Sequence, residues 1–285
     1  MPIITKTKMQ IYVINLNQSV DRLNCITEQL ERLNLPFYRL EAVDGNKLEI
    51  KKSRVNHFKF HLYTKRKCEK RELGCAESHR KVWNEILENG DSHALILEDD
   101  VILPKDTNEF LKLMEADPKL DIVNLSSSGS YALSPEKLMF LKNNQLYKRP
   151  YLKMRSSWKA IECGSWKIFS LTQVKDSFIC ECSVWPPLMS AYIVSQKACR
   201  ELLKASEELT CPIDYKPRKV NNPIRQGFCY PPYIIQNNSL ESTIGKRNEK
   251  IQVPLWIKFF GAFYKLRNFR RKFNLFHLYG LKSLF

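Results

Sequence analysis

The first 45 residues read as a strand, a helix and a second strand, and this order constrains the fold more than any other part of the sequence. Residues 10–16 are mostly β-branched, aromatic and apolar, which is typical of a buried strand. In residues 20–33 leucine and isoleucine recur every three or four positions, which predicts an amphipathic helix. Residues 37–43 predict another strand, followed by a turn at Asp44-Gly45. Strands joined by a crossover helix lie parallel in one sheet, so this opening predicts an α/β fold.

The alternation of helices and strands continues beyond this opening. A helix is predicted over residues 71–87, because Asn89-Gly90 suits the left-handed end of a helix. The short apolar run at 94–97 predicts a central strand, since both of its faces must be buried. Further strands are predicted at 121–125 and 188–194, and a helix from Ser195 to about Ala205. The sequence therefore predicts a central, mostly parallel sheet flanked by helices.

Neither repeats nor a Pro/Gly/Ser-rich linker divide the chain, so residues 1–249 are predicted to form one domain. The nine cysteines are an odd number without paired C-x-x-C spacing, which favours reduced thiols in the cytoplasm over a disulfide framework. Residues 1–10 lack the apolar core of a signal peptide, and no apolar run is long enough to span a membrane. These features predict a cytoplasmic protein.

The chain carries a formal charge of +16, from 46 Lys and Arg against 30 Asp and Glu, which indicates an anionic partner. Nucleic acid is disfavoured, because no base-reading element or known nucleic-acid motif is present. The excess is concentrated in the tail, residues 250–285, where seven basic residues and no acidic one follow Leu255. Aromatic residues accompany them at helical spacing: Trp256, Phe259, Phe260 and Phe263.

A basic amphipathic tail of this kind is typical of segments that lie on an anionic membrane surface. We therefore expect a peripheral position on the inner face of the cytoplasmic membrane. The alternative is a C-terminal helix packed against the domain. The helical phase drifts after Leu266, so a second short helix through residues 275–278 is also predicted.

Three consecutive carboxylates, Glu98, Asp99 and Asp100, stand between two apolar runs. Partly buried carboxylates repel one another and lose hydration, so all three stay ionised only beside a cation or many hydrogen-bond donors. In an extended chain Glu98 and Asp100 project to one face, where they could hold Mn²⁺ or Mg²⁺. The alternative is an acidic turn after a strand. No phosphate-binding P-loop and no Gly-x-Gly-x-x-Gly motif is present.

Several blocks together resemble glycosyltransferase family 25, the lipooligosaccharide galactosyltransferases related to collagen galactosyltransferases. The resemblance implies a GT-A fold, a UDP-sugar donor (usually UDP-galactose), inversion at the anomeric carbon and a lipid-linked oligosaccharide acceptor. The blocks run in order from about residue 10 to 245. They are residues 11–16 (IYVINL) with Ser19 and Asp21-Arg22, residues 42–45 (AVDG), residues 72–79 (ELGCAESH) with Trp83, residues 94–101 (ALILEDDV), and shorter matches at 191–194, 212–214, 232–236 and 242–245.

The resemblance also suggests roles for individual residues. Asp100 is assigned to the metal. Glu98 could share the ion or hold the ribose, and Asp99 could do either job. Asp214 is our choice for the general base, because the other matched acids lie in the carboxylate triplet or near the first strand. Asp214 could equally cap a helix or turn, and Glu162 is an outside candidate for the base.

Five more residues are predicted to contact the nucleotide. Asn15, Asp21 and Arg22 follow the first strand, although an exposed arginine on a helix face is the commoner fate for Arg22. Ser78 and His79 lie on the second helix, where a packed or hydrogen-bonded core pair is the alternative. Gln236 and Ser242 either contact the substrate or cap loops.

Two other functions remain open at this point. A nucleotidyltransferase would use the same donors, but that class usually begins with a Gly-rich and basic phosphate loop, which is absent after Leu16. A basic nucleic-acid-binding protein is the second alternative, suggested by charge alone. Release of UDP rather than pyrophosphate separates the transferase from the nucleotidyltransferase.

Overall fold

The computed structural model describes residues 9–49, 54–116, 118–129, 147–149, 166–237 and 269–283, together with four positions between 131 and 138. The predicted candidates Glu162 and Ser242, and the aromatic residues predicted in the first part of the tail, lie outside these described residues.

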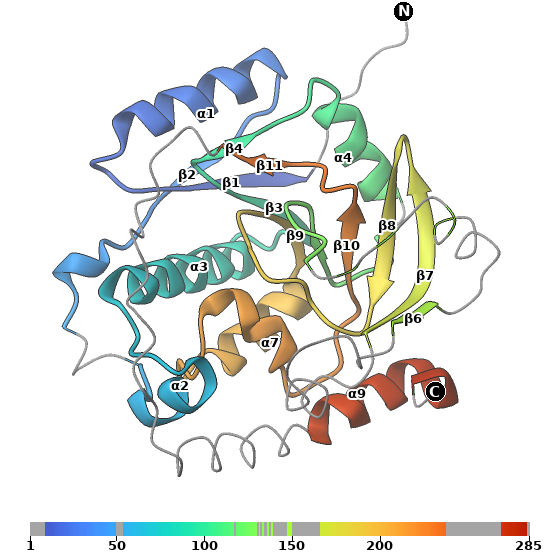
Figure 1. The fold of residues 1–285 in the computed structure, drawn as a ribbon. Coiled ribbons are helices and arrows are strands. Elements are labelled where there is room, and N and C mark those ends of the chain that lie inside the picture. The colour runs from blue at the N-terminus through green and yellow to red at the C-terminus, as the bar shows by residue number, and fades with distance from the viewer. Residues whose placement is uncertain are drawn as a thin grey trace, which may run out of the picture.

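A nine-stranded sheet forms the centre of the molecule (Figure 1). Its order is β2-β1-β3-β9-β5-β10-β8-β7-β6. The strands in that order are β2 (Tyr38–Glu41), β1 (Gln10–Asn15), β3 (His93–Glu98), β9 (Ala191–Ser195), β5 (Ile122–Asn124), β10 (Gln226–Tyr230), β8 (Ser177–Cys182), β7 (Trp166–Val174) and β6 (Tyr147–Arg149).

The predicted β-α-β opening is confirmed. Strand β1 pairs in parallel with β2 on one side and with β3 on the other. The connecting helix α1 (Val20–Arg32) buries Ile26 and Leu30, two residues of the predicted apolar face. Because the three parallel strands run in one direction, their carboxyl ends meet at one edge of the sheet.

The rest of the sheet is mixed, which differs from the mostly parallel sheet we predicted. Strand β9 lies antiparallel between β3 and β5, and β10 pairs parallel with β5 but antiparallel with β8. Strands β7 and β8 form an antiparallel hairpin. A buried apolar strand has the same local pattern in either direction, so the sequence predicted β9 as a strand but not its orientation.

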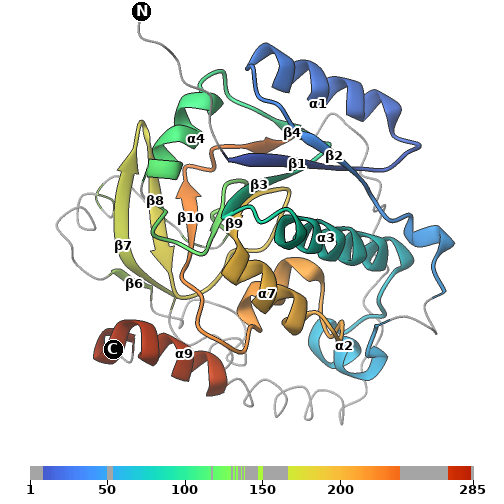
Figure 2. The same cartoon turned by 180° about the vertical axis from the view of Figure 1, so that it is seen from behind.

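Helices cover both faces of the sheet (Figures 1 and 2). One face carries α3 (Lys70–Glu88) and α7 (Gln196–Ala205), with α2 (His57–Thr64) beside them; the other carries α1 and α4 (Thr107–Ala116). Alternate residues of β3 serve the two cores, since Ala94 and Ile96 pack with the α3 side and Leu95 and Leu97 with the α1 side. Burying one such aliphatic side chain stabilises the fold by about 1.5–3 kcal/mol.

The C-terminal helix α9 (Phe269–Tyr279) packs against the domain and continues into the short 3₁₀ helix η5 (Gly280–Ser283). The Tyr279 ring stacks on Phe169 of β7, with centroids 3.7 Å apart, and its hydroxyl donates to Glu181 of β8 at 2.6 Å. Asn274 donates to the backbone oxygen of Asn221 at 3.1 Å. The helix predicted through 275–278 is therefore present, and one of its faces is packed. Within the described part of the chain, no helix is long and apolar enough to cross a bilayer.

Candidate functional site

A cavity of about 470 Å³ opens at the carboxyl ends of β1, β2 and β3. Its walls come from the segments that follow these strands, from helix α3 and from β11 (Ile235–Gln236), which pairs with β4 (Val101–Ile102) in a separate two-stranded sheet. In open α/β sheets, ligands bind at the carboxyl ends of the strands. The polar and charged lining includes Arg22, Asp44, Arg71, Cys75, Ser78, His79, Glu98, Asp99, Asp100 and Gln236.

Asp99 is held by two partners on the β1 side of the cavity. Asn15 donates to Asp99 Oδ2 at 2.7 Å, and Arg22 donates to Asp99 Oδ1 at 3.1 Å. Burial raises the pKa of Asp99, and these donors oppose that rise. Asn15 is itself buried, and its side-chain oxygen accepts two bonds from Arg39. Asn15 therefore positions Asp99, and it is absent from the cavity lining that we predicted it would join.

Asp100 is less completely satisfied. Gln236 donates to its Oδ2 at 2.9 Å, and Arg22 Nη1 lies 3.6 Å from the same oxygen. The other oxygen, Oδ1, is buried, and none of the described residues donates a hydrogen bond to it. Burial, followed by the charge of Glu98, raises the pKa of Asp100 to about 6. A buried carboxylate oxygen without a donor is costly unless a cation or ligand completes its environment.

Glu98 faces helix α3 and approaches His79, whose Nε2 lies 3.5 Å from Glu98 Oε1. The other ring nitrogen of His79, Nδ1, lies 2.9 Å from the Tyr192 hydroxyl, and Trp83 donates its indole N–H to that hydroxyl. His79, Tyr192 and Trp83 are all buried. His79 is thus a hydrogen-bonded core residue, which was the alternative to nucleotide contact, and it also lines the cavity.

Ser78 fixes a neighbouring wall of the cavity. Its hydroxyl accepts from the Val43 N–H at 2.8 Å and donates to the Gly74 carbonyl at 2.7 Å. Gly45 and Gly74 allow this loop to touch the helix, because a Cβ on Gly74 would lie 2.6 Å from the backbone of Gly45 and Val43. The second and third blocks of the family resemblance are therefore in direct contact.

The remaining predicted residues lie apart from these. Asp21 is exposed in the first turn of α1 and does not line the cavity, unlike its neighbour Arg22. Asp214 lies in the 3₁₀ helix η4 (Ile213–Arg218), where its Oδ2 accepts from the Leu188 N–H at 3.2 Å. It is not part of the cavity lining, although it is close enough for its charge to raise the pKa of Cys75.

The lining also includes Asp44, Arg71 and Cys75, for which no role was predicted. Arg71 and Cys75 border or lie within the third block, and Asp44 lies within the second, so the blocks themselves were the available signal. Burial, followed by the charge of Glu98, raises the pKa of the Cys75 thiol well above its usual value. Gln236, for which the sequence left substrate contact or loop capping open, contacts Asp100 directly.

These residues fit a divalent cation at Asp100 and Glu98. Among the described residues no donor reaches Asp100 Oδ1, and burial, followed by the charge of Glu98, raises the pKa of this carboxyl although Gln236 and Arg22 oppose the rise. Carboxylate oxygens are the ligands that Mn²⁺ and Mg²⁺ prefer. Asp99 is less suited to the ion, because both of its oxygens already accept hydrogen bonds.

Asp100 makes the stability of the metal-free protein depend on pH. Its folded-state pKa is raised, so it contributes most below its ordinary value, and this contribution is lost as pH rises to about 6. Wild type should therefore lose about 1 kcal/mol of unfolding free energy between pH 5 and pH 7.5 through this carboxyl, a loss that Asp100→Asn should not show. Urea unfolding of both proteins in chelator measures this difference, and a difference that does not change with pH contradicts the electrostatic description of Asp100.

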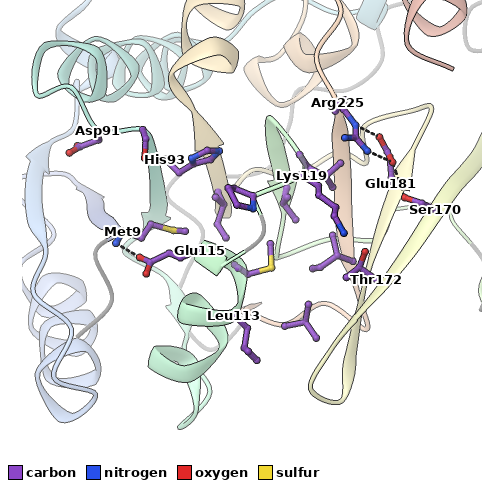
Figure 3. A pocket seen from close by; sticks show the side chains of 18 residues that line it. Met9, Asp91, His93, Leu113, Glu115, Lys119, Ser170, Thr172, Glu181 and Arg225 are labelled. Atoms are coloured by element: carbon purple, nitrogen blue, oxygen red, sulfur yellow. Dashed lines mark hydrogen bonds and ion pairs between the residues drawn. The ribbon is translucent and has the colours of Figure 1, made fainter. Parts of the chain in front are cut away.

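A second cavity, of about 310 Å³, lies at the opposite, amino ends of β1 and β3 (Figure 3). Its charged groups are engaged in contacts within the protein. Arg225 donates to both oxygens of Glu181, at 2.7 and 2.9 Å, and Asp91 accepts from the Tyr12 hydroxyl at 2.6 Å. Glu181 is a buried carboxylate, but both of its oxygens accept hydrogen bonds, and among the described residues no carboxylate of this cavity has a buried oxygen without a partner. The cavity at the carboxyl ends is therefore the candidate functional site.

The chain is similar to several proteins whose names describe glycosyltransferases. An Aedes aegypti protein named as a glycosyltransferase 25 family member is 33% identical over 108 residues, which cover 35% of this chain and 18% of that protein. A Haemophilus influenzae protein whose name describes a glycosyltransferase is 30% identical over 118 residues, 41% of this chain and 42% of that protein. Procollagen galactosyltransferase 2 of Mus musculus is 29% identical over 112 residues, 37% of this chain and 18% of that protein.

The chain thus matches less than half of the length of each of these relatives. The family model of glycosyltransferase family 25 (LPS biosynthesis protein) matches residues 8–216, most of the chain. That stretch contains the β-α-β opening, the glycine contact between loop and helix, and the carboxylate triplet. The chain belongs to glycosyltransferase family 25.

Proposed function

We propose that this protein is an inverting hexosyltransferase with a GT-A type of fold, which moves a hexose from a UDP-sugar to a lipid-linked oligosaccharide. The observation that carries the proposal is the Asp100 carboxylate, which lines the cavity of a family 25 chain with one buried oxygen unpartnered. A nucleotide diphosphate with its cation is the kind of ligand that this arrangement would accept. Galactose is the proposed sugar, because one of the relatives is named a procollagen galactosyltransferase.

The donor diphosphate would lie beside Arg22 and the carboxylates. When bound, Mn²⁺ or Mg²⁺ supplies Lewis-acid stabilisation of the leaving diphosphate. Asp100 and Glu98 would hold the ion. Asp99 orients Arg22 through the 3.1 Å contact, so that a guanidinium borders the cavity where phosphate charge would develop.

The acceptor hydroxyl must lose a proton during inverting transfer, and we assign this task to Asp214. Support comes from its charge, which contributes to the raised pKa of Cys75 in the cavity lining, and from the family match that includes residues 212–214. Its bond from the Leu188 N–H holds one oxygen in place. Leu188 has a left-handed backbone with φ of 79°, so this contact also stabilises an otherwise unfavourable loop conformation.

The proposed reaction is tested by incubating the protein with a panel of UDP-sugars, Mn²⁺ and an oligosaccharide acceptor preparation. The expected product is UDP together with a glycosylated acceptor. Pyrophosphate in place of UDP would instead identify a nucleotidyltransferase. Absence of both products with every sugar would contradict the transferase proposal.

We further propose that the C-terminal segment places the protein on an anionic membrane surface, beside a lipid-linked acceptor and on the cytoplasmic side. Helix α9 packs through Asn274 and Tyr279, while its other side exposes Phe273 and Phe276, which are 68% and 44% exposed. Leu281 of η5 is 66% exposed. Together with the positive charge of the tail, these apolar side chains suit the headgroup region of an acidic bilayer.

Liposome flotation with anionic vesicles tests the membrane proposal. Wild-type protein should float at low salt and bind less at high salt, because the basic residues attract the surface electrostatically. Phe273→Ser combined with Phe276→Ser should weaken partitioning roughly tenfold or more, since two exposed rings can no longer enter the headgroup region. Phe58→Ser, at an exposed phenylalanine of α2, is the matched control and should float like wild type. Equal flotation of all three proteins would sink the proposal.

A further inference from the structure

Cys75, His79 and Glu98 bring three different metal-ligating groups together in the wall of the cavity. Cys75 and His79 are four residues apart on α3, so their side chains lie on the same face of the helix. Glu98, at the end of β3, faces that helix. One thiol, one imidazole and one carboxylate atom of this group all lie within 4.8 Å of one another.

The separation of His79 and Glu98 fits a shared ion better than a direct hydrogen bond. Nε2 and Oε1 are 3.5 Å apart, which is longer than the 2.7–3.2 Å of a normal N–H···O bond. Zinc bonds of about 2.0 Å to nitrogen or oxygen and 2.3 Å to sulfur place tetrahedral ligands roughly 3.3–3.6 Å apart.

The surroundings of His79 are those of a supported ligand. Metal-binding histidines usually donate the second ring N–H to a fixed partner, which sets the tautomer and the ring orientation. Here Nδ1 lies 2.9 Å from the Tyr192 hydroxyl, and that hydroxyl is fixed by the Trp83 indole. With the proton on Nδ1, the lone pair of Nε2 points toward Glu98. In this tautomer Nε2 can bind an ion at the cavity wall.

The mixture of ligands selects the type of ion. Thiolate and imidazole favour zinc, whereas Mn²⁺ and Mg²⁺ prefer oxygen. Three protein ligands leave the fourth tetrahedral position open to water or to a molecule in the cavity. The cavity also provides a path for the ion, because all three residues line it.

We propose that Cys75, His79 and Glu98 form a zinc site that shares Glu98 with the donor site. Zinc binding releases the Cys75 thiol proton to solvent and engages the Glu98 carboxylate. Zinc should inhibit the transferase, because Glu98 that is bound to zinc can no longer bind Mn²⁺. This inhibitory effect rests on the function proposed above. Zinc binding itself does not depend on the protein's being a transferase.

Cobalt substitution tests the binding site without an activity assay. The full-length protein, stripped of metal with a chelator, should bind one Co²⁺ per chain and develop a thiolate-to-cobalt charge-transfer band. Cys75→Ser should abolish this band, and Glu98→Gln should weaken Zn²⁺ binding roughly 10–100-fold in competition with a chromophoric chelator. Cys25→Ser, at an exposed cysteine of α1, should keep the wild-type band and affinity.

A wild-type protein without the charge-transfer band, or a band that survives in Cys75→Ser, would overturn the site. The inhibitory role is tested separately through the Zn²⁺ concentration that halves Mn²⁺-dependent UDP release. For each protein, inhibition is measured against its own rate without zinc. The half-inhibitory Zn²⁺ concentration should be about tenfold or more higher in Cys75→Ser than in wild type, and an unchanged value would overturn the inhibition. A protein that binds Co²⁺ through Cys75 but releases no UDP would retain the zinc site and contradict only the proposed transferase.

Discussion

Asp100→Asn should lower sugar transfer by at least roughly 10²–10³-fold while leaving the fold intact, because a charge that stabilises the leaving diphosphate is lost. Asn keeps an oxygen for the 2.9 Å bond from Gln236 but cannot supply the anionic ligand. The unpartnered Oδ1 and the raised pKa show that this carboxylate is not required to stabilise the metal-free fold. The measurement is kcat for UDP release at saturating Mn²⁺, with thermal unfolding as the check on folding.

A matched control separates this effect from a general loss of negative charge. Asp176 is exposed in the turn between β7 and β8, on the hairpin side of the sheet. Asp176→Asn removes one carboxylate outside the cavity and should transfer sugar at the wild-type rate. Near-normal turnover in Asp100→Asn, or full wild-type activity in excess EDTA, would remove the metal from the mechanism.

Asp214→Asn should slow the transfer step by roughly 10²–10⁴-fold with little change in donor affinity, because the side chain loses the basic carboxylate. The asparagine oxygen can still accept from the Leu188 N–H, so the left-handed loop at Leu188 keeps its support. Single-turnover transfer and equilibrium binding of the UDP-sugar separate the two effects.

A purely structural role for Asp214 gives the opposite pattern. In that case Asp214→Asn would be nearly as active as wild type, whereas Asp214→Ala would lose thermal stability because the Leu188 N–H loses its acceptor. Fast transfer by Asp214→Asn would return the base to another acid, with Glu162 the outside candidate.

The elements that the sequence predicted are those with a complete local pattern. Helix α1 begins at Val20 as predicted, and α7 begins after Ser195, whose hydroxyl accepts from the Ala198 N–H as an N-cap. Gly90 adopts the left-handed conformation, with φ of 74°, just beyond the predicted end of α3. Periodicity, caps and glycine conformations depend on neighbours in the sequence, so they could be predicted.

The arrangement of the site depended on contacts between distant segments. The triplet was predicted as an extended chain, but β3 ends at Glu98 and the chain turns at Asp99 and Asp100. Their partners come from α1, β1 and β11, so Asp99 and Asp100 acquire different environments although they are adjacent. The carboxylate cluster was predictable from composition and position. The division of roles within it was not, because no local pattern specifies which donors reach each oxygen.

The same reason explains Cys75. Four-residue spacing places Cys75 and His79 on one face of a helix, but only the packing of α3 against the sheet brings that face to Glu98. In the tail, the sequence predicted a helix through residues 275–278 but did not decide between membrane contact and packing against the domain. Helix α9 forms as predicted, and contacts with Phe169 and Glu181 decide that one of its faces packs against the domain.

The measurement that tests the central proposal most directly is UDP release from UDP-galactose by purified protein, with Mn²⁺ and then with excess EDTA. We expect Mn²⁺-dependent release that increases with an oligosaccharide acceptor and falls by about 10²-fold or more in Asp100→Asn. Release that is equal with Mn²⁺ and with EDTA, or that is unchanged in Asp100→Asn, would contradict it.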